Sequence, residues 1–400
     1  MSMYLFSMSY FLAYCFYKDM YIVGVCMKKW LRVLLLAICV NIFVGNAFCE
    51  DVIHIGLICP LTGKWTNEGQ EMQNIVKLLA ENVNNLGGVN GKRVELIIED
   101  DAGDPRTAAL AAQKLASSGV VAIIGTYGSS ITEATQNIIN EAGIVQIATG
   151  STSNRLTEKG LPLFFRTSPR DSDQGIVAAD VISQKGYKSV AILHDNSSYA
   201  KGLAQETKRE LEKKGLSVVF FDALTPGEQD YTAILTKIQT TNPDLIFFTG
   251  YFPEAGLLLR QKSEMNWSVP IMGGDATNNI DLVKIAGKQA AKGYFFLSPP
   301  TAYDFNTPEA KAFFMEYKKQ YHKLPSAIWP IFAGEAFNVI IEALKQGRDS
   351  SKSIAFYLKH TLKDFPGLTG PISFNEHGDR IGNFYKVYYV DEQGTFVLEK

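Results

Sequence analysis

The sequence predicts an α/β protein of two lobes, each built on a doubly wound parallel sheet, with three chain segments crossing between the lobes. The 400 residues exceed what one hydrophobic core usually holds, so two domains of ordinary size are expected. From Val52 onward, short β-branched and aromatic runs alternate with longer amphipathic runs, which is typical of βαβ units. The alternation occurs in two blocks, and these predict the two lobes.

The first block contains four apolar runs that are short enough to be strands. These predicted strands span residues 52–58, 94–99, 120–125 and 144–148. Between the first two, residues 71–84 place Met72, Ile75 and Val76 at helical spacing, and Gly87 follows as a stop signal. This helix is expected to pack one face on the sheet.

The second block repeats the pattern of the first. Its predicted strands span residues 189–194, 217–221, 245–250 and 269–273, and its predicted helices residues 202–214 and 233–240. Later in the chain, residues 332–344 are expected to form a helix that returns to the first lobe. The last two predicted strands, residues 384–390 and 395–398, would complete the second lobe.

Proline-bearing segments mark where the chain crosses between the lobes. Ser168 and Pro169 form the first predicted crossing, residues 298–300 the second and residues 371–375 the third. Three crossings imply a hinge. The predicted organisation is a signal segment at residues 1–49, a first lobe of residues 51–169 with 299–375, and a second lobe of residues 170–298 with 376–400.

The composition limits the kinds of partner that the protein can have. It is 46% hydrophobic and 20% charged, which argues against disorder and against a membrane protein with many spans. The net charge is only −2, with 39 basic and 41 acidic residues. Such a chain has no strong field to hold a nucleic acid or an anionic membrane surface, so the ligand is expected to be small.

The N-terminal segment has the pattern of an export signal. The cationic sequence KKWLR at residues 28–32 precedes an apolar run at residues 33–44, and small residues follow. Cleavage before Glu50 is favoured over cleavage before Phe48. A membrane anchor is the alternative, but the run is shorter than the roughly 20 residues of a spanning helix. The expectation is a periplasmic protein exported through a cleaved signal peptide.

Two further features of this segment bear on the mature chain. Residues 1–26 precede a complete signal peptide that could begin at Met27, which indicates a misassigned start. Lipid attachment at Cys49 is an alternative fate, weakened by the bulky Phe48 before it. The other cysteines except Cys59 also lie in or ahead of the signal segment. Cleavage would leave Cys59 alone, and no internal disulfide could then form.

Seven short segments of the chain carry a resemblance to known proteins. They are GGVNG at residues 87–91, EDD at 99–101, LTEKG at 156–160, RTSPRD at 166–171, HDNSSY at 194–199, GYFPE at 250–254 and TGPISF at 369–374. In this order they resemble the leucine/isoleucine/valine-binding family of periplasmic proteins that serve ABC transporters. The resemblance implies the type I periplasmic binding protein fold, a branched-chain or related amino acid in the cleft, and delivery to membrane permease subunits.

A zwitterionic amino acid requires donors for its carboxylate, and the loops after two strands of the first lobe offer them. The sequence GTYGSS at residues 125–130 leaves a strand and enters a helix, with Ser130 and Glu133 at capping-box spacing. Free amides and a partial positive charge are expected there. By resemblance, Ser129 belongs to the pocket. Three residues after the next strand are expected to supply backbone and hydroxyl groups: Gly150, Ser151 and Thr152.

The ammonium group requires an acidic partner, and Asp275 follows an apolar strand of the second lobe. The family usually has an acidic residue here; aspartate in place of the longer glutamate shifts the contact by about one methylene. Without the resemblance, Asp275 reads as a turn residue. Tyr199 and Tyr251 match family positions in the second lobe and are expected to close over the ligand, apolar at one end and hydrogen-bonding at the other.

The apolar wall of the pocket is assigned to Trp65, although the aligned aromatic residue of some relatives falls nearer Glu68. Ala327 stands where the family often has a bulky aromatic residue, so the pocket is expected to be wider there. Relatives also tend to carry a cysteine pair at the positions of Gly103 and Gly128, and the bridge is absent here.

Two other classes of function compete with solute binding for a chain of this kind. An enzyme is disfavoured because the chain has no dinucleotide-binding, phosphate-loop or nucleophile-elbow motif, and its histidines are scattered without metal-ligand spacing. No cofactor or metal is therefore expected. A sensory receptor domain of the same fold, binding an amide or another small carboxylate, is the alternative to a transport component. A monomer that closes about its hinge is the expected mode of action.

Overall fold

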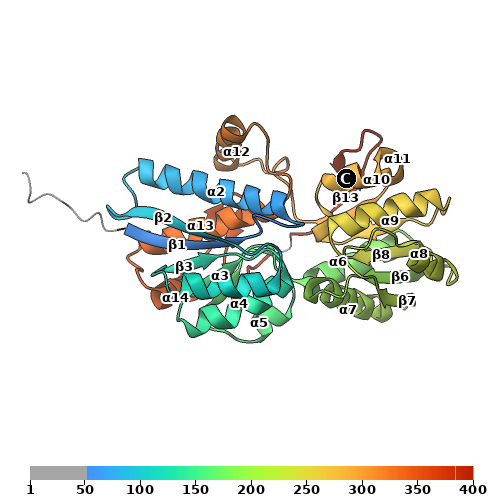
Figure 1. Cartoon of the computed structure of the whole chain (residues 1–400), viewed down its shortest axis with the longest axis horizontal. Helices are drawn as coiled ribbons and strands as arrows, with labels where there is room; N and C mark the ends of the chain where they lie inside the picture. Colours follow the sequence, from blue (N-terminus) through green and yellow to red (C-terminus); the bar gives the residue numbers. More distant parts are fainter. Residues whose placement is uncertain (1–51, 383, 400) are drawn as a thin grey trace, which may run out of the picture. The chain divides into compact units, whose positions relative to one another are not determined.

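The computed structural model describes residues 52–382 and 384–399, so the predicted signal segment, its cleavage sites and Cys49 lie outside the described residues. Most strands in the described part of the chain belong to two large sheets, shown with their helices in Figure 1. The predicted α/β architecture with two doubly wound sheets is confirmed.

The first sheet is parallel throughout, with the strand order β2-β1-β3-β4-β5. Its strands are β1 (Val52–Cys59), β2 (Arg93–Asp100), β3 (Ala122–Ile124), β4 (Val145–Ala148) and β5 (Phe164–Arg166). The helices around it are α2 (Thr66–Asn85), α3 (Pro105–Ala116), α4 (Ser129–Glu141), α5 (Arg155–Glu158), α13 (Trp329–Lys345) and α14 (Ser351–His360). Helix α2 packs against α13, and α3 packs against α4; in Figure 1, α2 lies above β1, and α3 and α4 lie below β3.

The second sheet repeats this winding and adds two antiparallel edge strands, in the order β14-β13-β10-β9-β8-β6-β7. Its strands are β6 (Ser189–His194), β7 (Ser217–Ala223), β8 (Leu245–Thr249), β9 (Ile271–Gly273), β10 (Phe295–Ser298), β13 (Lys386–Val390) and β14 (Phe396–Leu398). Its helices are α6 (Asp171–Gln184), α7 (Ser198–Lys213), α8 (Thr232–Gln239), α9 (Phe252–Glu264), the 3₁₀ turn η1 (Asp275–Thr277), α10 (Asp281–Ala286) and α11 (Lys288–Ala291).

The remaining elements lie between β10 and β13 in the sequence. They are α12 (Pro308–Tyr321) and the short antiparallel pair β11 (Phe365–Gly367) and β12 (Gly370–Ile372). The chain passes from the first sheet to the second after β5. In the second sheet, all five residues of the inner strand β8 are buried. Strands covered by helices on both faces read as continuous apolar runs, which is why the sequence pattern of this chain is so clear.

The predicted strands of both blocks are present, with ends within two residues of those expected. Helix α13 returns to the first sheet, and β13 and β14 join the second, as predicted. Strands β5 and β10 were missed because three or four residues carry no readable period. No helix in the described ranges is long and apolar enough to cross a bilayer.

Candidate functional site

The pairing register brings the loops of each sheet to one edge. In the first sheet, Leu57 pairs with Ile124, and Ile124 with Ile147, so the loops after β1, β3 and β4 leave side by side. In the second sheet, His194 pairs with Thr249. Carboxyl ends of parallel strands are the usual binding edge of such sheets. Every residue that the sequence singled out as a ligand contact lies in or next to one of these loops.

Side chains of the two binding edges contact each other directly. The Trp65 ring, after β1, lies 4.5 Å from the Tyr251 ring, after β8. The Ser130 hydroxyl accepts a hydrogen bond of 3.1 Å from the Ser198 amide, and Glu133 accepts one of 2.7 Å from the Ser198 hydroxyl. A depression of about 610 Å³ opens beside these contacts, between the N-termini of α4 and α7. The two edges therefore face one another across a narrow interface.

The predicted capping box at the start of α4 is wrong. Helix α4 begins at Ser129, its N-cap is Gly128, and no side chain caps it. Ser130 and Glu133 instead use their oxygens to hold Ser198 at the N-terminus of α7. The spacing of the serine and the glutamate fits a capping box, but both side chains form hydrogen bonds with Ser198, which is distant in the sequence.

The loop residues of the first sheet differ in what their side chains contact. The Ser129 hydroxyl accepts a 3.2 Å hydrogen bond from the Ser153 amide. A side chain at Gly150 would collide with Tyr127, since an added Cβ would lie 2.5 Å from its ring. Ser151 turns its hydroxyl inward to Thr132 and to the Tyr127 carbonyl at 3.2 Å. Thr152 Oγ1 is buried and acts on the Asp171 carboxyl as a weak hydrogen-bond donor.

Asp275 is fully buried at the start of η1 and receives two tyrosine hydroxyls. Tyr199 donates to Oδ1 and Tyr385 donates to Oδ2, each at 2.8 Å. Burial raises the pKa of Asp275, while hydrogen bonds from its neighbours partly oppose that rise. The sequence predicted Asp275 and Tyr199 at this site but not Tyr385, which arrives just ahead of β13 at the far end of the chain.

A second buried carboxyl, Asp171, lies beside this cluster as the first residue of α6. Its amide donates to the Thr152 carbonyl at 2.9 Å, and among the described residues only the Thr152 hydroxyl acts on its buried carboxyl as a weak hydrogen-bond donor. Burial raises the pKa of Asp171 well above its ordinary value and the negative charge of Asp275 adds to the rise, while the Thr152 hydroxyl opposes it. An uncompensated buried carboxylate is costly, so this position favours a cationic partner.

Trp65 lies between two glycines beside the same edge. An added Cβ at Gly103 would lie 2.9 Å from the indole ring, and one at Gly128 would lie 3.1 Å from it. The ring is 4% exposed and also meets the Tyr127 ring edge-on at 5.2 Å. These two glycines are the positions at which the resemblance implied a cysteine pair, and here the indole fills the space around them.

Glu68, on the first turn of α2, is a third buried acid near the interface. It is 1% exposed, and its Oε1 accepts a 2.7 Å hydrogen bond from the Asn279 side chain, which follows η1. Burial, together with the charge of Glu71, raises the pKa of Glu68 to about 8 from 4.5. Asp281 adds to this rise, and Lys323, which pairs with Glu71, opposes it.

We expect the stability of the ligand-free protein to fall as pH rises through neutrality because of Glu68. In the unfolded chain this carboxyl loses its proton near pH 4.5, whereas the folded protein retains it to about pH 8. The folded state therefore binds more protons in between, and unfolding becomes easier by roughly 2 kcal/mol from about pH 6 to about pH 8. Urea unfolding at several pH values measures this slope. Glu68→Gln should make the slope shallower by this amount, while other buried acids such as Asp101, whose pKa burial raises to about 7, keep part of it. An unchanged slope would contradict the assignment.

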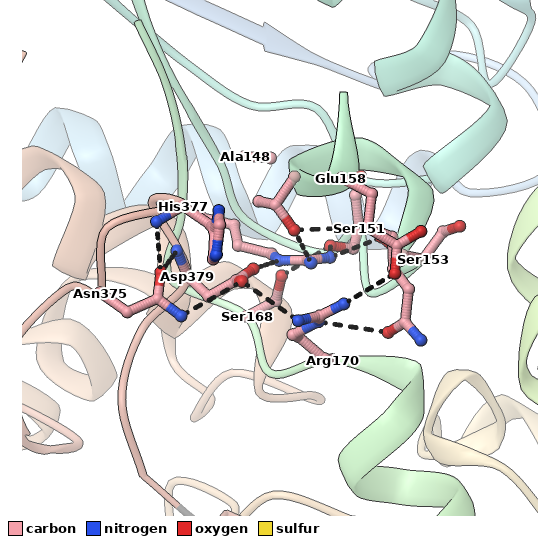
Figure 2. A network of polar contacts seen from close by, with 12 residues as sticks. Ala148, Ser151, Ser153, Glu158, Ser168, Arg170, Asn375, His377 and Asp379 are labelled. Atoms are coloured by element: carbon pink, nitrogen blue, oxygen red, sulfur yellow. Dashed lines mark hydrogen bonds and ion pairs between the residues drawn. The ribbon is translucent and has the colours of Figure 1, made fainter. Parts of the chain in front are cut away.

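A buried polar network supports the loop after β4 from behind. Arg166 donates from Nη1 to the Ser153 carbonyl at 2.8 Å and to the Ser151 carbonyl at 3.3 Å, and from Nε to Asp379 at 2.6 Å. Figure 2 shows Ser151 and Ser153 on one side of this network and Asp379 on the other. The network joins the binding edge to the segment that leads into β13.

Comparison with known proteins identifies relatives along almost the whole described chain. The sequence profile of the periplasmic binding protein family matches residues 52–395. A leucine-, isoleucine-, valine-, threonine- and alanine-binding protein of Pseudomonas aeruginosa is 33% identical over 356 residues, which cover 88% of this chain and 94% of that protein. The Leu/Ile/Val-binding protein of Escherichia coli K12 is 31% identical, covering 90% of this chain and 97% of its own.

Solved structures agree with the sequence comparison. The leucine-binding protein LivK of Thermotoga maritima superposes with a TM-score of 0.80 at 27% sequence identity. The superposition covers 87% of this chain and 98% of the LivK chain. LivJ of Streptococcus pneumoniae, solved with isoleucine, also gives a TM-score of 0.80, at 28% sequence identity. Here the superposition covers 87% of this chain and 99% of the LivJ chain. With two wound sheets, facing binding edges and a profile match over most of its length, this chain belongs to the periplasmic binding protein family.

Proposed function

We propose that this protein is the extracytoplasmic solute-binding component of an ABC importer and that it captures a branched-chain or related amino acid. The residues proposed to hold the ligand are Trp65, Ser129, Gly150, Ser151, Thr152, Tyr199, Tyr251 and Asp275. Asp171 is added to them because its carboxyl shares the site. The main observation behind the proposal is the pair of neighbouring buried carboxyls, Asp171 and Asp275, of which Asp171 has only the Thr152 hydroxyl as a hydrogen-bond donor among the described residues.

The charges at the site match a zwitterion better than an anion or a neutral amide. Apart from the Thr152 hydroxyl, the Asp171 carboxyl has no hydrogen-bond donor among the described residues, and an ammonium group between Asp171 and Asp275 would compensate both buried carboxylates. Ser153 Oγ is buried without a partner in the described part of the chain, and the Ser153 amide donates to Ser129 at the N-terminus of α4, where amides favour a carboxylate. The aromatic rings of Trp65 and Tyr251 supply an apolar wall. Relatives named for binding leucine, isoleucine and valine are consistent with this arrangement.

Capture is proposed to occur by hinge closure between two lobes, residues 51–169 with 299–375 and residues 170–298 with 376–400. The contacts of Ser198 with Ser130 and Glu133, and of Asn279 with Glu68, would hold the closed state together. Each contact joins the binding edge of one sheet to that of the other. A ligand that touches both edges stabilises closure because it binds the closed state better than the open one.

The remaining parts of the proposal follow from the family. The protein is proposed to act as a monomer in the periplasm, after removal of a signal segment at residues 1–49, and to deliver its ligand to permease subunits in the membrane. It is proposed to carry out no catalysis and to require no cofactor, metal or nucleic acid. The match to relatives named as binding proteins supports this assignment.

Thermal unfolding of the purified protein against a ligand panel tests the function. Bound ligand is removed by unfolding and refolding, and the panel contains amino acids together with simple amides and carboxylates that lack an ammonium group. An amino acid at a hundredfold excess over its Kd should stabilise the protein by about 2.7 kcal/mol, a shift of a few degrees in Tm. A shift produced only by ligands lacking the ammonium group would refute the role of Asp171 and Asp275 and favour a sensory receptor for amides or carboxylates.

A further inference from the structure

Glu68 lies close to the aromatic wall of the proposed pocket. Trp65 is the N-cap of α2 and Glu68 is the third residue of that helix, so the two belong to its first turn. Trp65 packs on Tyr127 and Tyr251, and the negative charge of Glu68 contributes to the raised pKa of the Tyr127 hydroxyl, after burial. Glu68 therefore lies beside the aromatic group of the site.

The polar atoms on this side of the site are not all satisfied. Glu68 Oε1 accepts the Asn279 amide at 2.7 Å, but Oε2 is buried without a partner in the described structure. The same holds for Trp65 Nε1 and for the Tyr127 hydroxyl. Three such atoms near one wall are unexpected for a pocket meant only for an aliphatic side chain, because a buried polar group left without a hydrogen bond is destabilising.

We propose that Glu68 is a specificity-determining residue that selects an amino acid whose side chain ends in an uncharged hydrogen-bonding group, a hydroxyl or an amide, over an aliphatic one of the same shape. This inference rests on the proposed function, in which an amino acid is the ligand. The main-chain end of the ligand would occupy the loops with Asp171 and Asp275, and its side-chain end would meet Glu68 Oε2.

The surroundings of Glu68 disfavour a charged side chain. Burial and the nearby Glu71 raise the pKa of Glu68 to about 8, so at neutral pH it is largely a neutral carboxyl, which donates at one oxygen and accepts at the other. A hydroxyl or an amide also does both. A cationic group would meet Lys64, whose Nζ already lies 4.4 Å from the centre of the Trp65 ring and 5.6 Å from that of Tyr251.

Three isosteric pairs of amino acids test the inference by calorimetry on the purified, ligand-stripped protein. The pairs are threonine with valine, asparagine with leucine, and glutamine with homoleucine. The side chain lengthens from one pair to the next, whereas the two members of each pair have the same shape. In the pair whose length fits, the polar member should bind at least about tenfold more tightly, since a site built to bond a polar group rejects the apolar isostere. Glu68→Leu should reverse that preference, and Glu68→Gln should keep it.

A second variant separates pocket selectivity from closure. Asn279→Ala removes the bond to Oε1 but leaves the carboxyl in place, so it should weaken both members of a pair by the same factor. Tighter binding of the apolar member in all three pairs overturns the inference, even if Glu68→Leu does not fold. An unchanged ratio in Glu68→Leu overturns it as well. If none of the six amino acids binds, the proposed function itself is wrong and the inference falls with it.

Discussion

Asp275→Ala is expected to weaken amino acid binding by more than about a hundredfold. The variant removes the acceptor of two tyrosine hydroxyls and leaves the ligand ammonium group with one carboxyl, Asp171, instead of two. Breaking a buried charged pair costs roughly 3 to 5 kcal/mol, and every 1.4 kcal/mol is about a factor of ten in Kd. Titration calorimetry with the amino acid that gives the largest thermal shift measures the loss.

Two other variants keep this experiment decisive. Asp275→Asn retains an oxygen that can accept a tyrosine hydroxyl, so it should fold normally and still bind weakly because the charge is gone. Asp281→Ala removes an aspartate six residues later, whose side chain is partly exposed and pairs with Lys284. This variant should bind the amino acid normally. Normal affinity in Asp275→Asn would mean that Asp275 does not hold the ammonium group.

Arg166→Met is expected to destabilise the ligand-free fold by roughly 3 to 5 kcal/mol, because it leaves the buried Asp379 without its main counter-charge. Burial alone would raise the pKa of Asp379, but the charges of Arg166 and Arg170 lower it below its ordinary value. The variant also removes the donor to the Ser151 and Ser153 carbonyls. Urea denaturation with the midpoint and slope fitted separately measures the effect.

Arg170→Met is the matched control for this prediction. Arg170 reaches the same carboxylate at 3.5 Å, but a quarter of its side chain is exposed, so its loss should cost less than about 1 kcal/mol. Combining Arg166→Met with Asp379→Leu should recover part of the stability, because no buried charge is then left alone. Equal losses in the two single arginine variants would show that the buried network does not support the loop.

The fold was predictable because its elements are long and its apolar runs strongly periodic. Strand β8 is apolar except for Thr249, and α2 shows Met72, Ile75 and Val76 at helical steps, so neither depends on distant contacts for its recognition. Strand β5 is three residues long and shows no such period. The capping box failed for a related reason, since the side chains of Ser130 and Glu133 were taken by Ser198, which is remote in the sequence.

The site was predictable only where a loop follows a recognisable strand. Asp275 and Tyr251 lie just after β9 and β8, so their placement at the edge followed from the topology. Tyr385 arrives from a segment more than a hundred residues away, and only the folded chain reveals its contact with Asp275. Asp171 lies in the RTSPRD segment, but the scarcity of hydrogen-bond donors around its carboxyl is a property of packing and leaves no trace in the sequence.

The Trp65 ring held against Gly103 and Gly128 has a consequence for how the protein matures. The apolar contact joins these turns without sulfur chemistry, and Cys59, the free cysteine of residues 52–399, is buried. Assembly of this edge therefore does not wait for an oxidising compartment or a thiol oxidase, and reducing agents leave it intact. The same contact restricts sequence change: at Gly103 an added Cβ would lie 2.9 Å from the indole and the backbone φ of +65° disfavours any side chain, and at Gly128 an added Cβ would lie 3.1 Å from the indole, which would have to shift by a few tenths of an ångström.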